Sequence, residues 1–352
     1  MTPDRFHEIS ARYASLRVAL VGDFCLDRYL EIDPARAEVS IETNREVHNV
    51  VRVRSQPGGA GTILNNLAAL GVGRIHALGF SGDDGEGFEL RRALDLVRTP
   101  AGGACVELGH FQTSAERRTF TYCKPLVVAL GREPVELNRL DSKNWTPTPR
   151  EVEDRLIAAI GALRDSVDAV ILLDQVDVPE TGVVTKRVRE AVAEAFAARP
   201  DVVVLADSRR GLREFPKLGF KMNAAELARM NSESTVANSA GALPELAAVR
   251  AAAASLAQAN DKPVFITLAE RGIIGAMPDG MSEHAQAHPV RGPIDVVGAG
   301  DSVTANLTAA LAAGATVREA LDLTMAAASL VVHQLGTTGT ANVAELRELL
   351  FA

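Results

Sequence analysis

Cysteine and long apolar runs are both scarce in this chain of 352 residues. Its three cysteines, Cys25, Cys105 and Cys123, are widely spaced and form neither a disulfide framework nor a Cys-x-x-Cys metal pair. The longest apolar runs, such as residues 169–173, are far too short to span a bilayer, and the polar N-terminus lacks the apolar core of a signal peptide. Because thiols stay free in reducing compartments, we expect a cytoplasmic protein without membrane contact.

Several nucleotide-binding and metal-binding patterns are also missing. The chain contains no Gly-x4-Gly-Lys-Ser/Thr P-loop, and residues 59–64 begin like a dinucleotide fingerprint but lack its third glycine. His284 and His288 have the spacing of helical metal ligands, but Pro289 and the preceding turn residues argue against a helix there. A net charge of −8 argues against a broad nucleic-acid surface, although local dipoles can still hold a nucleotide.

Strand-like and helix-like segments alternate along most of the chain. Short apolar runs predict strands at 17–22, 74–79, 169–173, 202–206 and 264–268. Helical spacing is found at 86–97, 151–163, 181–198, 243–257 and 321–333. This alternation predicts an α/β fold, a mostly parallel sheet with helices on both faces. Asp23, Asp174 and Asp207 follow three of the strands, and ligands bind beyond the carboxyl ends of strands in such sheets.

Two regions, at about 26–56 and 104–141, interrupt this alternation with β-rich pieces such as residues 46–54 and 118–122. We interpret them as a small β lid inserted into the α/β body. Residues 141–149, which contain Trp145 and two prolines, are expected to lead the chain back into the body.

The most informative stretch is Pro-Ile-Asp-Val-Val-Gly-Ala-Gly-Asp at 293–301, directly before a helix predicted at 302–314. At a helix start the dipole is positive and glycines leave the amides open, so Gly298, Ala299 and Gly300 could hold a developing phosphate charge. The neighbouring carboxylate of Asp301 could accept the proton of an attacking hydroxyl. Together they favour phosphoryl transfer to an alcohol. The alternative is that Asp301 is a simple N-cap after a Gly-x-Gly turn.

The sequence resembles the PfkB, or ribokinase-like, carbohydrate kinases. Asp-Val-Val-Gly-Ala-Gly-Asp at 295–301 resembles their C-terminal signature, and the glycine-rich stretch at 56–71 resembles their sugar-contacting turn and helix. Four weaker motifs follow the family's order, at 21–27, 79–84, 223–226 and 267–272. The resemblance runs from residue 17 to the C-terminus. Within the family, residues 21–28 and 335–338 look most like bacterial heptose-7-phosphate kinases of the ADP-heptose pathway.

This resemblance implies a single ribokinase-like kinase domain over residues 1–352, with ATP and Mg²⁺ as cofactors and a monovalent cation as a further candidate. It also implies a homodimer through the β lid. In the family, the motif at Asn223 and Glu226 organises Mg²⁺ and the nucleotide phosphates, here expected through water. Its two oxygen-bearing side chains lie at i and i+3 on one helix face, which suits Mg²⁺. The alternative is a helix N-cap with a capping-box glutamate.

On the acceptor side, the resemblance points to Asp23, Asp27, Gly58, Gly59 and Asn66. Carboxylates accept hydrogen bonds from sugar hydroxyls, and glycines allow the backbone to approach a ligand closely. We favour Asp23, Gly58 and Gly59 over Asp27 and Asn66. The alternative is a solvated loop followed by a tight turn.

Thr267 and Gly272 match the family's loop near the nucleotide, although an ordinary strand end would have the same residues. The chain departs from the family in having Val296 for a threonine, Ala269 for a glycine and Thr62 for an asparagine. It also lacks the lysine expected after Asp174, and has arginines at 209–210 near the place of another. Arginine does not replace lysine equivalently, so these changes argue against heptose 7-phosphate as the favoured acceptor.

We therefore predict ATP-dependent phosphoryl transfer to a hydroxyl of a sugar or sugar phosphate, with Asp301 as the general base. Two alternatives stay open: a catalytically weak relative that only binds nucleotide or sugar, and a nucleoside kinase of the same fold. The presence of Asp301 distinguishes an active kinase from the catalytically weak relative, since a site that has lost its activity usually loses its general base.

Overall fold

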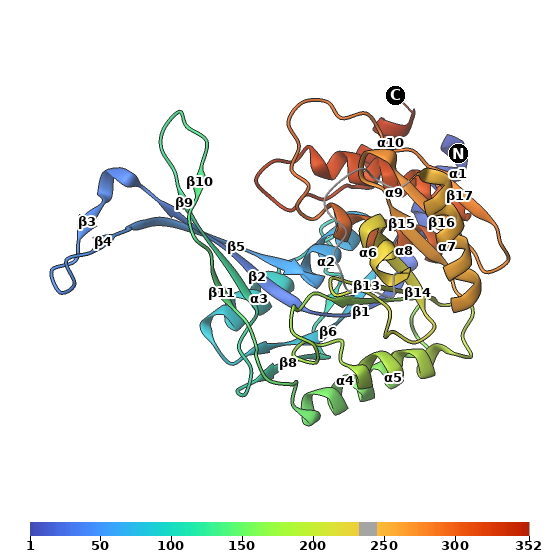
Figure 1. The fold of residues 1–352 in the computed structure, drawn as a ribbon, viewed down its shortest axis with the longest axis horizontal. Helices are drawn as coiled ribbons and strands as arrows, with labels where there is room; N and C mark the ends of the chain where they lie inside the picture. Colours follow the sequence, from blue (N-terminus) through green and yellow to red (C-terminus); the bar gives the residue numbers. More distant parts are fainter. Residues whose placement is uncertain (232–244, 352) are drawn as a thin grey trace.

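The computed structural model describes residues 1–231 and 245–351, which form an α/β body and a projecting β arm (Figure 1). The sheet of the body has the strand order β17-β16-β15-β14-β13-β12-β1-β6-β7, and β8 also pairs with β6. Its strands are β1 (Arg17–Gly22), β6 (Arg74–Gly82), β7 (Val106–Glu107), β8 (Phe111–Ser114), β12 (Ala169–Asp174), β13 (Val203–Ser208), β14 (Gly219–Asn223), β15 (Val264–Thr267), β16 (Ile273–Ala276) and β17 (Ser282–Ala285).

The body sheet is parallel from β7 to β15, and only β16 and β17 at one edge run antiparallel to their neighbours. The predicted α/β architecture is therefore confirmed. β14 was not predicted, because its five residues include Gly219, Lys221 and Asn223 and so lack a continuous apolar run.

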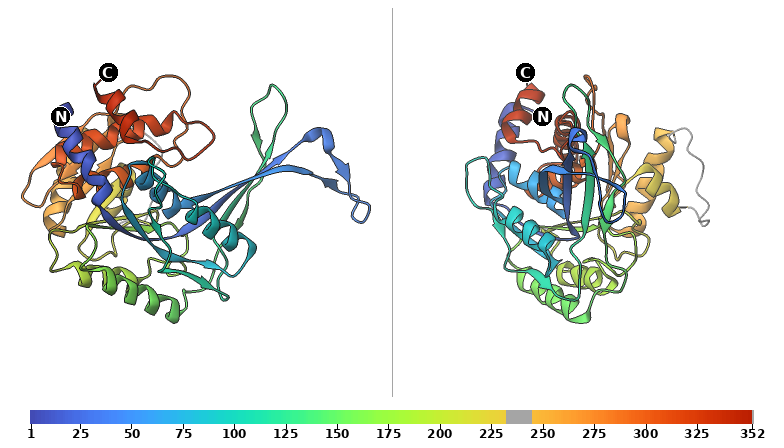
Figure 2. Two further views of the ribbon diagram at one scale, coloured as in Figure 1. Left: turned by 180° about the vertical axis from the view of Figure 1, so that it is seen from behind. Right: turned by 90° about the vertical axis from the view of Figure 1, so that its left-hand side faces the viewer.

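Helices cover both faces of the body sheet (Figures 1 and 2). One face carries α1 (Pro3–Arg12), α2 (Ala60–Ala69), α3 (Gly85–Asp95), α8 (Ala299–Ala312), α9 (Val317–Val332) and α10 (Val343–Phe351). The other carries α4 (Arg150–Leu163), α5 (Lys186–Phe196), α6 (Ala224–Asn231) and α7 (Leu246–Asn260). Short 3₁₀ turns are η1 (Tyr13–Ser15), η2 (Pro34–Arg36) and η3 (Ala269–Arg271).

The core consists of two apolar layers, one on each side of the sheet. Successive side chains of a strand point to opposite faces, so Val18 and Leu20 of β1 join one layer while Ala19 and Val21 join the other. A strand buried on both faces is apolar at almost every position, which explains why β1 and β12 could be recognised as continuous apolar runs. None of the helices in the described residues is long and apolar enough to cross a bilayer.

The β arm is a second sheet with the order β10-β9-β2-β5, with β11 also paired to β9. Figure 2 shows it extending away from the body, with the β3-β4 hairpin at the far end of one ribbon. Its elements are β2 (Phe24–Ile32), β3 (Glu38–Val39), β4 (Glu46–Val47), β5 (Val50–Gly59), β9 (Thr121–Val127), β10 (Val135–Glu136) and β11 (Leu140–Ser142). The second segment of the arm is shorter than the predicted 104–141, because β7 and β8 pair with β6 of the body sheet instead.

The carboxyl ends of the body strands meet at one edge of the sheet. Asp174 is the last residue of β12, and Asp207 is the next-to-last residue of β13. Asn223 and Thr267 are the last residues of β14 and β15. The start of α8 lies at the same edge, since Thr304 of α8 bonds to Asp207. This edge therefore gathers most of the residues that the sequence singled out.

Candidate active site

The amino end of α8 forms the centre of the site. Gly298 caps the helix with φ +82°, a left-handed conformation that favours glycine, and a Cβ there would lie 3.3 Å from Thr338 and 3.4 Å from Thr62. Ala299, Gly300 and Asp301 follow in the first turn, where backbone amides have no acceptor within the helix. The structure thus brings the four predicted residues together as an amide cradle with an adjacent carboxylate.

The carboxyl group of Asp301 is poised to exchange a proton near neutral pH. Burial raises its pKa from 3.8 to about 7, and the nearby carboxylates of Asp207 and Asp27 add to this rise, while the ammonium of Lys221 opposes it. A general base works best when its pKa is close to the working pH. This electrostatic setting favours the catalytic interpretation of Asp301, and the N-cap of the helix is Gly298 rather than Asp301.

A buried lysine that the sequence did not single out completes this side of the site. Lys221 of β14 is 7% exposed, and its Nζ lies 2.8 Å from Oδ2 of Asp207, which also accepts a hydrogen bond from Thr304. A Cβ on Gly300 would lie 3.3 Å from the same Nζ, so the ammonium faces the amide cradle. The only sequence signal was its position two residues before Asn223.

Asp27, rather than Asp23, is the acidic residue that faces Asp301. Its carboxylate packs against Gly58, where a Cβ would collide with Asp27 Oδ2, and it contributes to the raised pKa of Asp301. Cys25 lies beside Asp27 and Gly58, because a Cβ on Gly58 would also contact the Sγ of Cys25. β2 and β5 pair so that Cys25 is opposite Gly58, and the carboxylate of Asp27 lies beside Gly58.

Asp23 is bonded to backbone amides of a neighbouring loop, and its contact with a sugar stays a prediction. It is 2% exposed, and its two oxygens accept the amides of Gln175 at 2.7 Å, Val176 at 3.3 Å and Val183 at 2.6 Å. Burial, and then the nearby Asp174, raise its pKa to about 7, although the backbone donors oppose this. These three hydrogen bonds hold the loop after β12 in place.

Gly59 and Asn66 also serve the local structure. Gly59 has φ +57°, and a Cβ would lie 2.5 Å from the carbonyl oxygen of Asp23, so no other residue fits without strain. Asn66 of α2 is fully buried, and its amide donates to the carbonyls of Thr62 and Gly339 at 3.0 and 3.3 Å. The structure places Asn66 in the interior, and its contact with the acceptor stays a prediction.

Asn223 and Glu226 form a reciprocal capping box at the start of α6. The amide of Asn223 donates to Glu226 Oε2 at 2.7 Å, and the amide of Glu226 donates to Asn223 Oδ1 at 2.9 Å. The capping alternative is thus present in the structure. Burial raises the pKa of Glu226, Asp207 adds to this rise, and Lys221 opposes it, so the carboxylate belongs to the same charged cluster.

Thr267 and Gly272 delimit a tight loop after β15. Gly272 has φ +92°, and a Cβ there would collide with the carbonyl oxygen of Ala285. Ala269, which stands where the family has glycine, adopts φ +53°. This left-handed conformation costs a non-glycine residue about 1 kcal/mol, which explains the family's preference.

Five arginines could act as phosphate ligands, two at 209–210 and three from the lid side, and each of them has another partner in the structure. The buried guanidinium of Arg117 donates to the carbonyls of Thr146, Pro147 and Thr181. Arg210 pairs with the buried carboxylate of Asp174 at 2.8 Å. The remaining pairs are Arg118 with Asp84 at 3.8 Å, Arg139 with Asp141 at 3.0 Å, and Arg209 with Asp177 at 3.7 Å.

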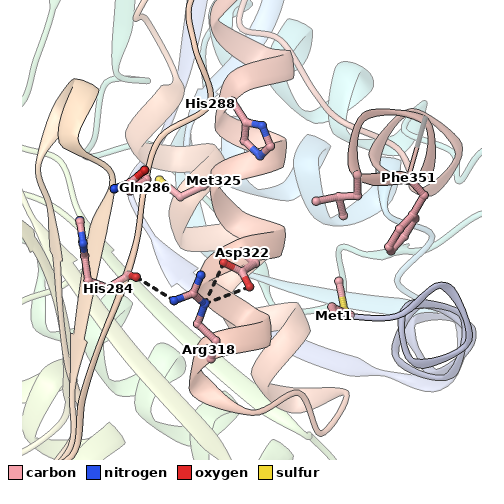
Figure 3. Close-up of a pocket in the computed structure, with 9 residues that line it drawn as sticks. Met1, His284, Gln286, His288, Arg318, Asp322, Met325 and Phe351 are labelled. Carbon is pink, nitrogen blue, oxygen red and sulfur yellow. Dashed lines mark hydrogen bonds and ion pairs between the residues drawn. The ribbon is translucent and has the colours of Figure 1, made fainter.

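A separate pocket of about 420 Å³ lies between β17, α9 and α10 (Figure 3). It contains His284 and His288, but none of the predicted site residues. Arg318 in this pocket is held by Asp322 and by the carbonyl of His284. The described residues contain no group of three or more His, Cys, Asp or Glu side chains that could hold a metal ion.

Comparison with known proteins shows what the chain resembles in sequence and in fold. Residues 212–343 match the pfkB family carbohydrate kinase model. The "Bifunctional protein HldE" of Bradyrhizobium sp. (strain ORS 278) is 31% identical over 354 residues, covering 97% of this chain and 65% of the relative. The protein of the same name from Hyphomonas neptunium is 31% identical, covering 96% and 64%. The chain thus spans just under two thirds of the length of these relatives.

Solved structures share the fold at low sequence identity. Arabidopsis thaliana ribokinase, complexed with ribose and ATP, superimposes with a TM-score of 0.65 at 19% identity, covering 96% of this chain and 99% of that one. Escherichia coli phosphofructokinase-2, in complex with substrates and products, gives 0.69 at 18% identity, covering 95% and 98%. These superpositions show that the chain has the ribokinase-like fold, and the segment that matches the pfkB family carbohydrate kinase model holds Lys221, Asn223 and Asp301.

Proposed function

We propose that the chain transfers the γ-phosphoryl group of ATP to a hydroxyl of a sugar or sugar phosphate, with Asp301 as the general base. The observation that carries this proposal is a carboxyl group of raised pKa, about 7, in the first turn of α8 beside an open amide cradle. The retained base and the buried Lys221 argue against a catalytically weak relative.

The residues of the site fit the cofactors that this reaction needs. The first-turn amides and the ammonium of Lys221 are donors suited to phosphate oxygens. Glu226 uses Oε2 in its cap, which leaves Oε1 as a ligand for Mg²⁺ or its ordered water. When bound, ATP would supply the phosphoryl group and Mg²⁺ would neutralise part of its charge.

The reaction then follows from what these side chains can do. Asp27 accepts a hydrogen bond from the acceptor and orients it, and Asp301 takes the proton of the attacking hydroxyl. The amides of Gly300 and Asp301 and the ammonium of Lys221 donate to the charge that develops during transfer. The β arm would close over the acceptor and limit water access, as lids do in other enzymes.

We expect the favoured acceptor to be an unphosphorylated sugar or small polyol, because Arg117 and Arg210 are committed elsewhere and Arg209 pairs with Asp177. An ADP-coupled assay should therefore give a higher kcat/KM for hexoses, pentoses or nucleosides than for heptose 7-phosphate. A preference for the phosphorylated heptose that drops about tenfold or more in Arg209→Ala, but not in Arg199→Ala before β13, would show that arginine has replaced the lysine. Turnover of none of these acceptors would exclude the proposed function.

If Glu226 acts through Mg²⁺, Glu226→Gln should raise the Mg²⁺ concentration for half-maximal rate about threefold to tenfold, because a neutral amide is a weaker ligand. Loss of the cap alone would cost about 0.5–2 kcal/mol of stability without this shift. Glu345→Gln is the matched control, since Asn342 and Glu345 form the same capping pair at α10. Equal Mg²⁺ dependence in both variants would leave Glu226 only the capping role.

We further propose that two copies associate through their β arms. The arm exposes apolar side chains that a second copy could cover: Val39 is 59% exposed, Ile41 98% and Leu130 105%. Light scattering tests this, and a monomeric mass at micromolar concentration would exclude it.

A further inference from the structure

The proposed acceptor pocket contains two carboxylates that repel each other. Asp27 of β2 is 7% exposed and contributes to the raised pKa of Asp301 across the pocket. Burial also raises the pKa of Asp27 itself. An acceptor hydroxyl needs both groups ionised, one to bind it and one to take its proton. Some positive charge must therefore stabilise the pair on the Asp27 side, as Lys221 does beside Asp301.

Lys124 of β9 lies where that charge is needed. β9 runs parallel to β2 with Lys124 opposite Tyr29, so Lys124 and Asp27 are diagonal neighbours on one face of the arm. Its Nζ is 3.7 Å from Oδ1 of Asp27, and it donates to the hydroxyl of Tyr29 at 3.4 Å. The two side chains of the ion pair are only 14% and 10% exposed, so solvent screens them weakly.

The contacts of the Lys124 side chain fix the position of its ammonium group. Its Nζ lies 4.9 Å from the centroid of the Tyr29 ring, and the guanidinium of Arg54 lies 4.8 Å from the same centroid. These cross-strand neighbours from β2 and β5 restrict where the lysine side chain can move. The long side chain is thus aimed back along the arm toward the pocket.

The other charged groups near Asp27 are less suited than Lys124 to stabilise its carboxylate. Arg139 also stabilises the Asp27 carboxylate, but it forms two hydrogen bonds with Asp141 and stacks on Tyr122. Asp141 and Asp301 are themselves negative and raise the pKa of their neighbours. Cys25 is buried and its thiol pKa is raised by burial, so it stays uncharged. Among the described groups around Asp27, Lys124 is the cation without a competing carboxylate.

We propose that Lys124 is a positioning residue for the acceptor: its ammonium keeps Asp27 ionised and oriented, and lowers the repulsion that Asp27 exerts on Asp301. This inference rests on the proposed phosphoryl transfer, and it adds a residue of the arm that acts through Asp27 without touching the reacting atoms. It also assigns β9 a direct function, because the strand delivers the charge that the pocket lacks.

The test compares Lys124→Met, Lys124→Arg and the distant surface control Lys186→Met, at the start of α5. In Lys124→Met we expect the KM for the acceptor to rise about fivefold to tenfold with the KM for ATP unchanged. The acid limb of the pH profile of kcat/KM should move up by about one pH unit, since an opposite charge at this distance lowers a carboxyl pKa by about that much or more. Lys124→Arg should restore both values to within about twofold.

A second readout is independent of turnover. Carboxyl ¹³C titration of Asp27, assigned with Asp27→Asn, should show its pKa rising by about one unit in Lys124→Met and not in Lys186→Met. Wild-type titration of Asp27 in Lys124→Met would overturn the proposal, as would a lower melting temperature with unchanged acceptor KM and pH profile. If the wild type phosphorylates no acceptor, the proposed function fails, whereas the titration still decides the role of Lys124.

Discussion

Asp301→Asn is expected to lower kcat by about 10²–10⁴-fold while the affinity for ATP stays close to that of the wild type. Asparagine has nearly the same shape as aspartate, so the amide cradle at Gly298 and Gly300 is preserved, but it cannot accept the proton of the attacking hydroxyl. Steady-state rates and nucleotide titration of the same protein measure the two effects separately. Near-normal kcat in the variant would remove Asp301 from the mechanism.

The pH dependence provides an independent check of this role. Because the pKa of Asp301 is about 7 in the folded protein, the active, ionised form is lost as the pH falls through 7, and the wild-type rate should fall with it. The same raised pKa has the opposite effect on stability, which falls as the pH rises. The folded state binds the proton more tightly than the unfolded state, so Asp301 destabilises the protein increasingly as the pH rises from about 4 to 7.

Asp301→Asn removes that charge and should raise the melting temperature at pH 8 but not at pH 4. Burial of Asp301 near Asp207 thus lowers the stability of the folded protein, and in the proposed mechanism it gives the base a suitable pKa. Asp95→Asn, at the end of α3, is the control because Asp95 is exposed. A variant that loses activity and is also less stable at pH 8 would contradict the electrostatic account.

Local patterns were sufficient to predict the fold class and to place a helix start at α8. Strands such as β1 and β12 are buried on both faces and therefore appear as continuous apolar runs. The start of α8 could be located because glycines and an aspartate occur together only where backbone geometry and a helix end both demand them. These features are encoded within ten or so consecutive residues.

The division of labour between Asp23 and Asp27 could not be read in the same way. Both follow the first strand, and both are carboxylates. Their difference arises from partners far away in sequence: the loop at 175–183 supplies amides to Asp23, whereas pairing of β2 with β5 turns Asp27 toward Gly58. The burial of Asn66 could not be predicted for a related reason, because its side chain donates to the carbonyl of Gly339, which is far away in sequence.

Lys221 shows a second limit of the sequence. A single lysine in a weakly apolar segment is usually solvent-exposed, and nothing local indicates that this one is buried. Its burial follows from the place of β14 between β13 and β15, and its ion pair with Asp207 depends on the register of that pairing. The capping box of Asn223 and Glu226, two residues further on, has local causes and was foreseen as an alternative.

Lys221→Met is expected to have the second large effect, lowering kcat by about 10²–10³-fold, comparable to removing one donor from an anion hole. The ammonium is the buried cation facing the amide cradle, so its loss weakens stabilisation of the transferring phosphoryl group. It also opposes the raised pKa of Asp301, and the acid limb of the rate profile should therefore move to higher pH. Steady-state rates between pH 6 and 9 measure both changes.

Stability must be separated from catalysis in this variant, because breaking a buried ion pair leaves Asp207 without its cation and can cost about 3–5 kcal/mol. The double variant Lys221→Met with Asp207→Asn removes both charges, and it should regain most of the lost stability without regaining the rate. Lys217→Met, in the exposed segment before β14, is the control for loss of a lysine. If the double variant recovers activity together with stability, Lys221 serves the fold alone, and the anion-holding role falls to the helix amides.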